Sequence, residues 1–237
     1  MYSGPAGIVG LDFPPDLSHV RGMTDEPHGF HPAAFTVASD EPDASFFARR
    51  DPGPLMDPGA QSAVTALYHT LVAEGADVLD LMAGPDSHLP RDATYGSVIG
   101  IGLDADAMAD NPRIGHRIVQ DLNATPTLPL PDDAVDVACL CDVAPYLRQP
   151  MATLAEIRRV LRPGGVVIVT FSDRVIAGKA VALWQALDST DRRRLLTILL
   201  QRAGFAGIDS GEVHPPADTP SWRDTVYAIT ARVPNAA

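Results

Sequence analysis

The stretch LAEIRRVLRPGGVVIVTF, which runs from Leu154 to Phe171, decides the fold of this chain. Its first half places apolar residues at helical spacing, and a Pro-Gly-Gly turn then stops the helix. Its second half is an uninterrupted apolar run of mainly β-branched residues, which is typical of a strand buried on both faces. A helix that leads through a tight turn into such a strand predicts a unit of a parallel sheet covered by helices.

Earlier and later segments repeat this alternation. A helix is expected from Pro58, with Asp57 as its N-cap, and another ends at Gly204. The runs that predict strands are residues 78–82, 97–103, 117–119, 135–141, 166–171, 206–213 and 225–233. The compact loop 215–220 favours a hairpin between the last two. The sequence therefore predicts a doubly wound α/β fold, a mostly parallel seven-stranded sheet whose last strand is antiparallel.

Length and composition suggest one domain preceded by an arm. A chain of 237 residues can bury one substantial core and is short for two full domains. Residues 1–52 are dense in Pro, Gly, Asp and His without periodicity, so we expect a poorly ordered or loosely packed arm ahead of a domain over 53–237. His19, His28 and His31 lie in the arm, but their spacing matches no metal-ligand motif, and we expect no metal site.

The charge balance excludes several partners. A net charge of −12, from 30 acidic against 18 basic residues, argues against nucleic acid and against anionic membranes. No apolar run approaches the ~20 residues that span a bilayer, and Cys139 and Cys141, two apart in a predicted strand, point to one face and cannot bridge each other. We expect a cytoplasmic protein with free thiols; the sequence leaves a monomer and a homodimer both open.

One carboxylate lies within the first predicted strand, and one lies at the end of each of the next two. Asp80 lies inside an apolar strand, where a charge is costly to bury without partners. Asp104 ends the second strand, at a spacing from Asp80 that resembles that of a carboxylate meeting a nucleotide ribose. Asp121 ends the third strand. Ligands of open parallel sheets bind at this edge, so these residues are candidates for a nucleotide-like ligand.

Five segments in order now carry a resemblance: VLDLMAGPDS, GLDADAM, QDLNATPTLPLPDDAVDVA, EIRRVLRPGGVVIVTFSDR and LLQRAGF. Together they resemble the successive motifs of class I S-adenosylmethionine-dependent methyltransferases, over roughly residues 60–233. The resemblance implies S-adenosylmethionine as cofactor. The residues that it implies around the cofactor are Asp80, Met82 and Gly84 at the methionine part, Asp104 at the ribose, and Asp121 and Leu122 at the adenine. Ala105 and Asp142 are further candidates for the cofactor site, and Asp142 could instead hold the acceptor or the loop after the fourth strand.

The first motif departs from the family pattern. Such enzymes usually show three glycines at alternate positions, whereas Met82 and Asp86 stand at the first and third and only Gly84 remains. Glycine lets the backbone approach a ligand and adopt positive φ. Pro90 also interrupts the helix that would follow. The segment is similar to a less characterised methyltransferase-like group whose first motif reads DLM and continues into Ser-His-Leu-Pro.

Two side chains are candidates for catalysis. His88 follows the cofactor loop and titrates near neutrality, so it is the first candidate for a general base; a structural role in the irregular loop is the alternative. Tyr146 follows the fourth strand, where acceptors often lie in this fold, or else it caps the edge of the core. Trp184, at helical spacing with apolar neighbours, is expected in the core.

The leading hypothesis is an enzyme that transfers a methyl group from S-adenosylmethionine to an O, N or C nucleophile of a small molecule. The second is a methyltransferase-like binding or regulatory protein without turnover, which the missing glycines favour. A third, a nicotinamide-dependent oxidoreductase, is disfavoured because its glycine fingerprint is poor.

Overall fold

The computed structural model describes residues 30–48 and 55–235. Within them, seven strands form one sheet in the order β3-β2-β1-β4-β5-β7-β6. The strands are β1 (Asp77–Leu81), β2 (Ser97–Gly102), β3 (His116–Val119), β4 (Val135–Cys141), β5 (Leu161–Phe171), β6 (Ala206–Val213) and β7 (Val226–Arg232). Only the two pairings that involve β7 are antiparallel. The predicted fold class and the terminal hairpin are confirmed.

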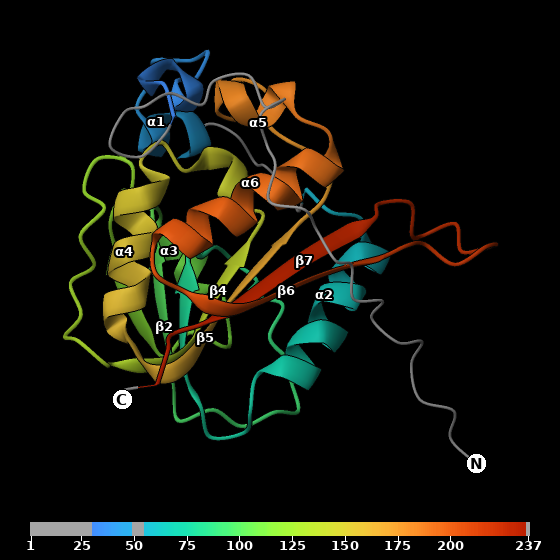
Figure 1. Cartoon of the computed structure of the whole chain (residues 1–237). Coiled ribbons are helices and arrows are strands. Elements are labelled where there is room, and N and C mark those ends of the chain that lie inside the picture. The colour runs from blue at the N-terminus through green and yellow to red at the C-terminus, as the bar shows by residue number, and fades with distance from the viewer. Residues whose placement is uncertain (1–29, 49–54, 236–237) are drawn as a thin grey trace.

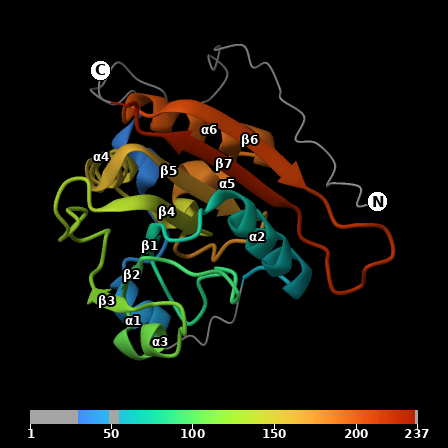
Figure 2. The same ribbon diagram turned by 90° about the horizontal axis from the view of Figure 1, so that it is seen from below.

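Helices cover both faces of the sheet (Figures 1 and 2). They are α2 (Pro58–Leu71), α3 (Ala105–Ala109), α4 (Pro150–Val160), α5 (Ala182–Ala186) and α6 (Ser189–Arg202), with a 3₁₀ turn η2 (Ala144–Tyr146). Asp57 caps α2 as expected, because its side chain accepts from the Ala60 amide at 2.9 Å.

Alternation along the buried strands divides the core between the two faces. Leu79 and Leu140 belong to the cluster that packs on α4 and α6. Val78 and Cys139 belong to the cluster on α2, and Cys141 packs against that same cluster. The two cysteines therefore share a face and are free thiols, as predicted.

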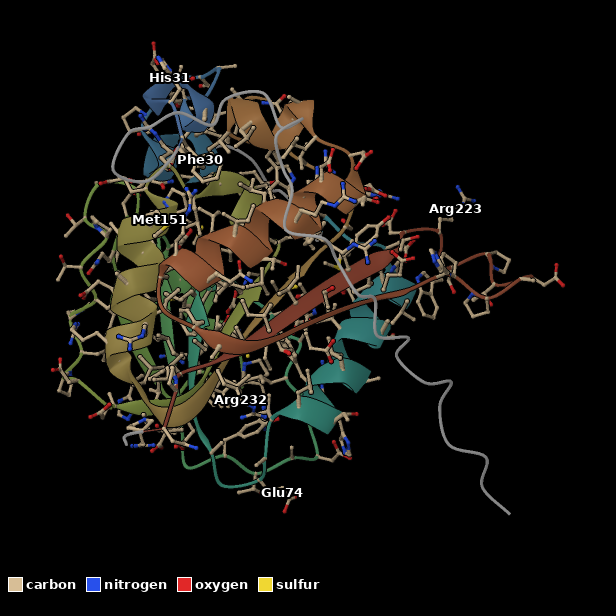
Figure 3. The ribbon with its side chains drawn as sticks, viewed as in Figure 1. Phe30, His31, Glu74, Met151, Arg223 and Arg232 are labelled. Atoms are coloured by element: carbon tan, nitrogen blue, oxygen red, sulfur yellow. The ribbon has the colours of Figure 1, made fainter. Side chains whose placement is uncertain are left out.

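The arm differs from the expectation in the part that the structure describes. Residues 30–48 contain the 3₁₀ turn η1 (Pro32–Phe35) and the helix α1 (Asp43–Ala48). Phe30 is buried in the main core, and it lies at the opposite end of the molecule from Glu74 (Figure 3). These short segments are packed rather than loosely draped. They bury isolated aromatic residues without a periodic pattern, so the sequence did not reveal them; residues 1–29 and 49–52 lie outside the described residues.

The sheet order reverses between β1 and β4. Open α/β sheets bind ligands beyond the carboxyl ends of their strands at such a reversal. The segment after β1 is irregular, with no helix between residues 82 and 96, as Pro90 indicated. This edge is the place to examine for a site.

Candidate functional site

Asp80, Asp104 and Asp121 lie at the carboxyl ends of three neighbouring strands. Asp80 is the last residue but one of β1, and the other two follow the ends of β2 and β3 by two residues. β2 pairs with both β1 and β3, and neighbouring strands are about 4.8 Å apart. The structure thus brings the three predicted carboxylates to one edge.

Asp104 and Asp121 are held in the same way. Oδ1 of Asp104 accepts from the backbone amides two and three residues further along, at 2.8 and 3.1 Å, and so caps α3. Oδ1 of Asp121 accepts from the equivalent amides at 2.8 and 3.3 Å. No described residue donates to either Oδ2. Each carboxylate is therefore fixed through one oxygen and has its other oxygen available for a ligand.

Asp80 is the buried member of the set. It is 5% exposed, and its Oδ2 has no hydrogen-bond partner among the described residues. Burial raises the pKa of Asp80 to about 7. A hydrogen bond from Ser87 opposes this shift, and the charge of Asp86 adds to it. A buried acceptor without a donor is costly, so this oxygen suits a ligand that brings a donor or a positive charge.

The loop after β1 leaves room for a ligand. Its backbone is pinned to β2, because Ala83 donates to the Ile101 carbonyl at 2.9 Å, and a Cβ at Gly102 would lie 2.2 Å from the Ala83 oxygen. By contrast, a Cβ at Gly84 would meet no atom within 4 Å. The one glycine that remains in the motif thus borders open space.

Met82 stands where the family pattern has a glycine, and its backbone has a conformation that glycine favours. Its φ is 53°, in the left-handed region. Its side chain packs against the apolar cluster that contains Tyr146 and Ile176. The thioether is accommodated beside the site by these neighbours.

Asn111 is a site residue that the sequence reasoning missed. It is 1% exposed, and its Nδ2 donates to the Gly84 carbonyl at 3.0 Å and to the Ser87 hydroxyl at 2.8 Å. It therefore holds the loop in place from the β2–β3 connection. A single Asn in a turn-rich segment carried no pattern that would have marked it.

His88 follows this loop, also with positive φ, at 54°. Its amide donates to Asp86 Oδ1 at 2.8 Å, and its Nδ1 lies 3.8 Å from Asp86 Oδ2. Burial lowers the pKa of His88, and Asp86 opposes that shift. The ring is thus neutral at pH 7 and can accept a proton. The hydrogen bond of its backbone amide stabilises the conformation of the loop.

Asp142 and Tyr146 follow β4. Oδ1 of Asp142 accepts from the Ser172 amide at 3.2 Å. Burial raises the pKa of Asp142 to about 7; the Ser172 amide opposes this, and Asp224 adds to it. Tyr146 is buried, and its hydroxyl accepts from the Ile176 amide at 3.0 Å. The observed geometry of Tyr146 is thus that of a residue at the edge of the core, and its catalytic role stays a prediction.

Backbone strain gathers at this edge. Met82, His88 and Asp142 are three of the five described non-glycine residues with positive φ. Such conformations cost roughly 1–3 kcal/mol each and are found preferentially at functional sites, where the surroundings impose them.

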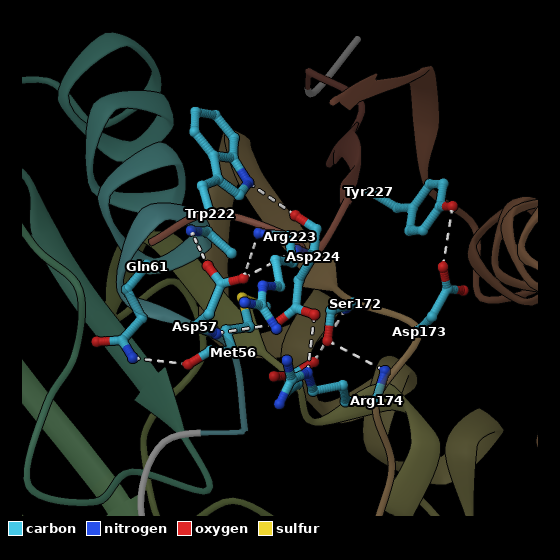
Figure 4. Close-up of polar contacts among 12 residues, drawn as sticks. Met56, Asp57, Gln61, Ser172, Asp173, Arg174, Trp222, Arg223, Asp224 and Tyr227 are labelled. Atoms are coloured by element: carbon cyan, nitrogen blue, oxygen red, sulfur yellow. Dashed lines mark hydrogen bonds and ion pairs between the residues drawn. The ribbon is translucent and has the colours of Figure 1, made fainter. Parts of the chain in front are cut away.

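A polar network joins the β6–β7 loop to two other segments of the chain, as Figure 4 shows. Asp57 Oδ2 accepts from the Asp224 amide, and Asp224 Oδ2 accepts from the Asp57 amide, both at 2.9 Å. Arg174 Nε lies 2.7 Å from Asp224 Oδ1, and Trp222 donates to the Asp224 carbonyl at 2.7 Å. The β6–β7 loop is thereby tied to the start of α2 and to the loop after β5.

Two further features bear on partners. In residues 30–48 and 55–235, no helix has the length and apolar character needed to cross a membrane. The same residues contain no group of three or more His, Cys, Asp or Glu side chains suited to a metal ion. Nδ1 of His31 accepts from the Ala33 amide at 3.1 Å; His19 and His28 lie outside the described residues.

Comparison with known proteins agrees with this arrangement. Residues 79–169 match a family model described as a methyltransferase domain. An uncharacterised methyltransferase of Mycobacteroides abscessus is 35% identical over 105 residues, which are 41% of this chain and 40% of that protein. The chain thus matches about two fifths of the length of that curated relative.

Solved structures support the fold. The cyclase SpnF has a TM-score of 0.55 at 20% identity, over 74% of this chain and 82% of its own. The phosphoethanolamine N-methyltransferase 2 of Haemonchus contortus, solved with S-adenosyl-L-methionine, has a TM-score of 0.53 at 13% identity, over 73% of this chain and 53% of its own. The family model matches residues 79–169, and in this part and in the strand order of its sheet the chain resembles class I S-adenosylmethionine-dependent methyltransferases.

Proposed function

We propose that this protein transfers the methyl group of S-adenosylmethionine to an O, N or C nucleophile of a small molecule in the cytoplasm. The observation that carries the proposal is the row of three carboxylates, each with an oxygen that no described residue engages. The cofactor offers hydrogen-bond donors at three separated points: an ammonium group, the ribose hydroxyls and the adenine amino group.

Each carboxylate has a matching partner on the cofactor. Asp80 suits the ammonium group, Asp104 the ribose hydroxyls and Asp121 the adenine amino group, because hydrogen bonds to a charged acceptor are the strong ones. Leu122 is buried next to Asp121 and offers an apolar surface to the adenine. Ala105, the first residue of α3, is exposed and small beside the ribose position.

The site also fits the cofactor in shape and charge. The space beside Gly84 lets a ligand approach the backbone. Asp80 and Asp142, whose pKa values are about 7, are partly protonated near neutral pH. A bound sulfonium cation favours their ionised forms, and the negative charge of these groups and of Asp86 in turn favours the cation over its neutral product. When bound, the cofactor supplies an electrophilic methyl group.

The acceptor needs orientation more than acid–base help. Much of the rate of such a transfer can come from holding two reactants in line. In this proposal Tyr146 and Met82 form an apolar wall for the acceptor. His88 removes the proton where the nucleophile carries one, since its lowered pKa keeps the imidazole neutral at pH 7.

The glycine-poor loop favours a second candidate, a protein that binds the cofactor or its demethylated product without turnover. The cyclase SpnF has the same fold at 20% identity, and a fold by itself does not fix a reaction. Binding with no methyl transfer to any acceptor in a broad panel of small nucleophiles would favour this candidate.

Calorimetric titration tests the proposal. S-adenosylmethionine and S-adenosylhomocysteine should bind and NAD should not. Asp104→Ala should weaken binding by about 1.5–3 kcal/mol, the range for a hydrogen bond to a charged group. Asp104→Asn keeps an N-cap for α3 but loses the charge, so it separates the contact from damage to the helix. Asp110→Ala, at an exposed position at the other end of α3, is the matched control; equal affinities for all variants would refute the assignment.

A further inference from the structure

A buried ion pair ties the arm to the domain. Nζ of Lys179 lies 2.7 Å from Oδ1 of Asp43, and the two side chains are 2% and 10% exposed. The same ammonium group donates to the carbonyl groups of Ser39 and Glu41 and lies 5.0 Å from the centre of the Phe46 ring. Removing one partner of such a pair leaves a buried charge without compensation, so this contact fixes the position of α1 strongly.

The second oxygen of Asp43 connects α1 to the carboxyl ends of the parallel strands, where the cofactor is proposed to bind. Oδ2 accepts from Nδ2 of Asn123 at 2.9 Å, and that same nitrogen donates to the Tyr146 carbonyl at 2.9 Å. The backbone amide of Asn123 in turn donates to Oδ1 of Asp121 at 2.8 Å. A continuous hydrogen-bonded path therefore runs from Lys179 through Asp43 and Asn123 to the carboxylate at the end of β3.

The arm also packs near the loop after β1, at the other end of the row of carboxylates. Phe46 and Phe47 of α1 pack against the apolar cluster around Tyr146, and Met82 of the loop after β1 packs against the same cluster. Phe47 meets the Tyr146 ring edge-on at 6.4 Å. In Figures 1 and 3, α1 lies at the opposite end of the sheet from Arg232, the last residue of β7. Since β7 is antiparallel to β5, that end is the carboxyl edge of the parallel strands.

We propose that Asp43 is a positioning residue of the cofactor site. Held by Lys179, it fixes Asn123 and the turn that presents Asp121, and it seats α1 over the loop after β1. Packing of residues 30–48 and binding of the cofactor then favour each other, and this coupling must be reciprocal. The inference rests on the proposed function, since it needs a cofactor at Asp121.

Four variants test the inference. Asp43→Asn keeps the side-chain shape and removes the charge that Lys179 neutralises. Asn123→Asp places a second carboxylate against Asp43. It keeps the side-chain oxygen that accepts from the Arg148 amide, at 2.9 Å in the wild type. The double variant with both changes swaps the two groups and restores a hydrogen bond between positions 43 and 123. Asp132→Asn is the control, because it removes the charge of an exposed carboxylate from a pair of equal length, 2.7 Å, with Arg159.

Two measurements are made on every protein: the Kd for S-adenosylhomocysteine by calorimetry, and amide hydrogen exchange of residues 30–48. In the wild type, the ligand should slow this exchange. Each single variant should speed exchange without ligand and raise Kd by about tenfold, within the usual range for coupled sites. The swap should recover part of both effects, and the control should change neither.

The failures are distinguishable. If exchange of the arm accelerates in the single variants while Kd stays within twofold of the wild type, the arm is only structural and the inference is overturned. If the wild type binds no S-adenosylhomocysteine at millimolar concentration, the proposed function itself is overturned. Circular dichroism verifies the fold of each variant, and the conservative Asp43→Asn change keeps the test meaningful if Asn123→Asp does not fold.

Discussion

The two edges of the sheet treat their carboxylates in opposite ways. At the amino edge, Arg162 lies 2.9 Å from Asp77 of β1 and 2.8 Å from Asp136 of β4. Burial alone would raise the pKa of Asp136, but its hydrogen bonds with Arg162 and the Asp77 amide hold the value below the ordinary one. At the carboxyl edge of the same two strands, burial raises the pKa of Asp80 and of Asp142 to about 7, and neither has a described cation in an ion pair.

The difference separates stability from function. Carboxylates that are paired within the protein contribute to folding and have little left to offer a ligand. Carboxylates that are buried without a partner cost folding energy and are retained where a ligand brings the missing charge. The contrast can be tested one edge at a time.

The largest effect is expected for Asp80→Asn. Below pH 4 the carboxyl is protonated in the native and unfolded states alike. As the pH rises from about 4 to about 7, the unfolded state gives up its proton and the native state keeps it, so the wild type loses roughly 1.4 kcal/mol of stability per pH unit. The variant does not titrate at this position. Its stability relative to the wild type should rise by about 3 kcal/mol between pH 5 and pH 7.5, measured by urea denaturation.

Asp136→Asn is the matched control for that experiment. The lowered pKa of Asp136 means that its stabilisation is present above the unfolded value and is lost only as the pH falls below it. The stability difference between this variant and the wild type should therefore stay constant from pH 5 to pH 7.5. Parallel pH profiles for Asp80→Asn and the wild type would show that Asp80 is not a destabilising buried acid.

A smaller effect of opposite sign is expected for Arg162→Met at the amino edge. It leaves Asp77 and Asp136 without their shared cation, and it removes a hydrogen bond to the Ala134 carbonyl at 2.8 Å. Because these side chains are partly exposed, the loss should be only about 1–2 kcal/mol by urea denaturation. Cofactor affinity should not change. Arg232→Met is the control, because this arginine is exposed and donates to a backbone carbonyl. A weakened cofactor affinity in Arg162→Met would show that the amino edge also contributes to ligand binding.

The smallest effect is expected for Met82→Gly. Glycine removes a left-handed strain of roughly 1–2 kcal/mol, but the apolar contact with the Tyr146 cluster is lost, so stability should change by less than about 1 kcal/mol. Calorimetry should find S-adenosylmethionine bound by both proteins. Binding by the glycine variant alone would mean that the thioether fills the methionine position, which would favour a wild type that does not use the cofactor.

The sequence predicted the framework because the framework is local and periodic. The helix from Pro58, the run 135–141 and the segment from Leu154 to Phe171 are each specified by neighbouring residues. Asp80, Asp104 and Asp121 could be placed at one edge because parallel strands all end there. Their roles as cofactor ligands are still predictions.

The remainder depended on contacts between distant residues. Asn111 reaches back 27 residues to Gly84, and Asn123 reaches back 80 residues to Asp43. Neither contact has a periodic signal. Residues 30–48 resembled a loose arm because their order comes from one buried ion pair and scattered aromatic residues rather than from an apolar face.

The position of β7 has a consequence for synthesis of the chain. In the sheet, β7 lies between β5 and β6, although it follows both in sequence. A ribosome that has delivered β5 and β6 has not yet delivered the strand that joins them, so both leave unpaired edges that can recruit another chain. The contact between Asp57 and Asp224, which are 167 residues apart, also forms only after this segment has been synthesised. A chaperone that covers the β5 edge during translation should therefore raise the yield of soluble protein more than slower overall synthesis does.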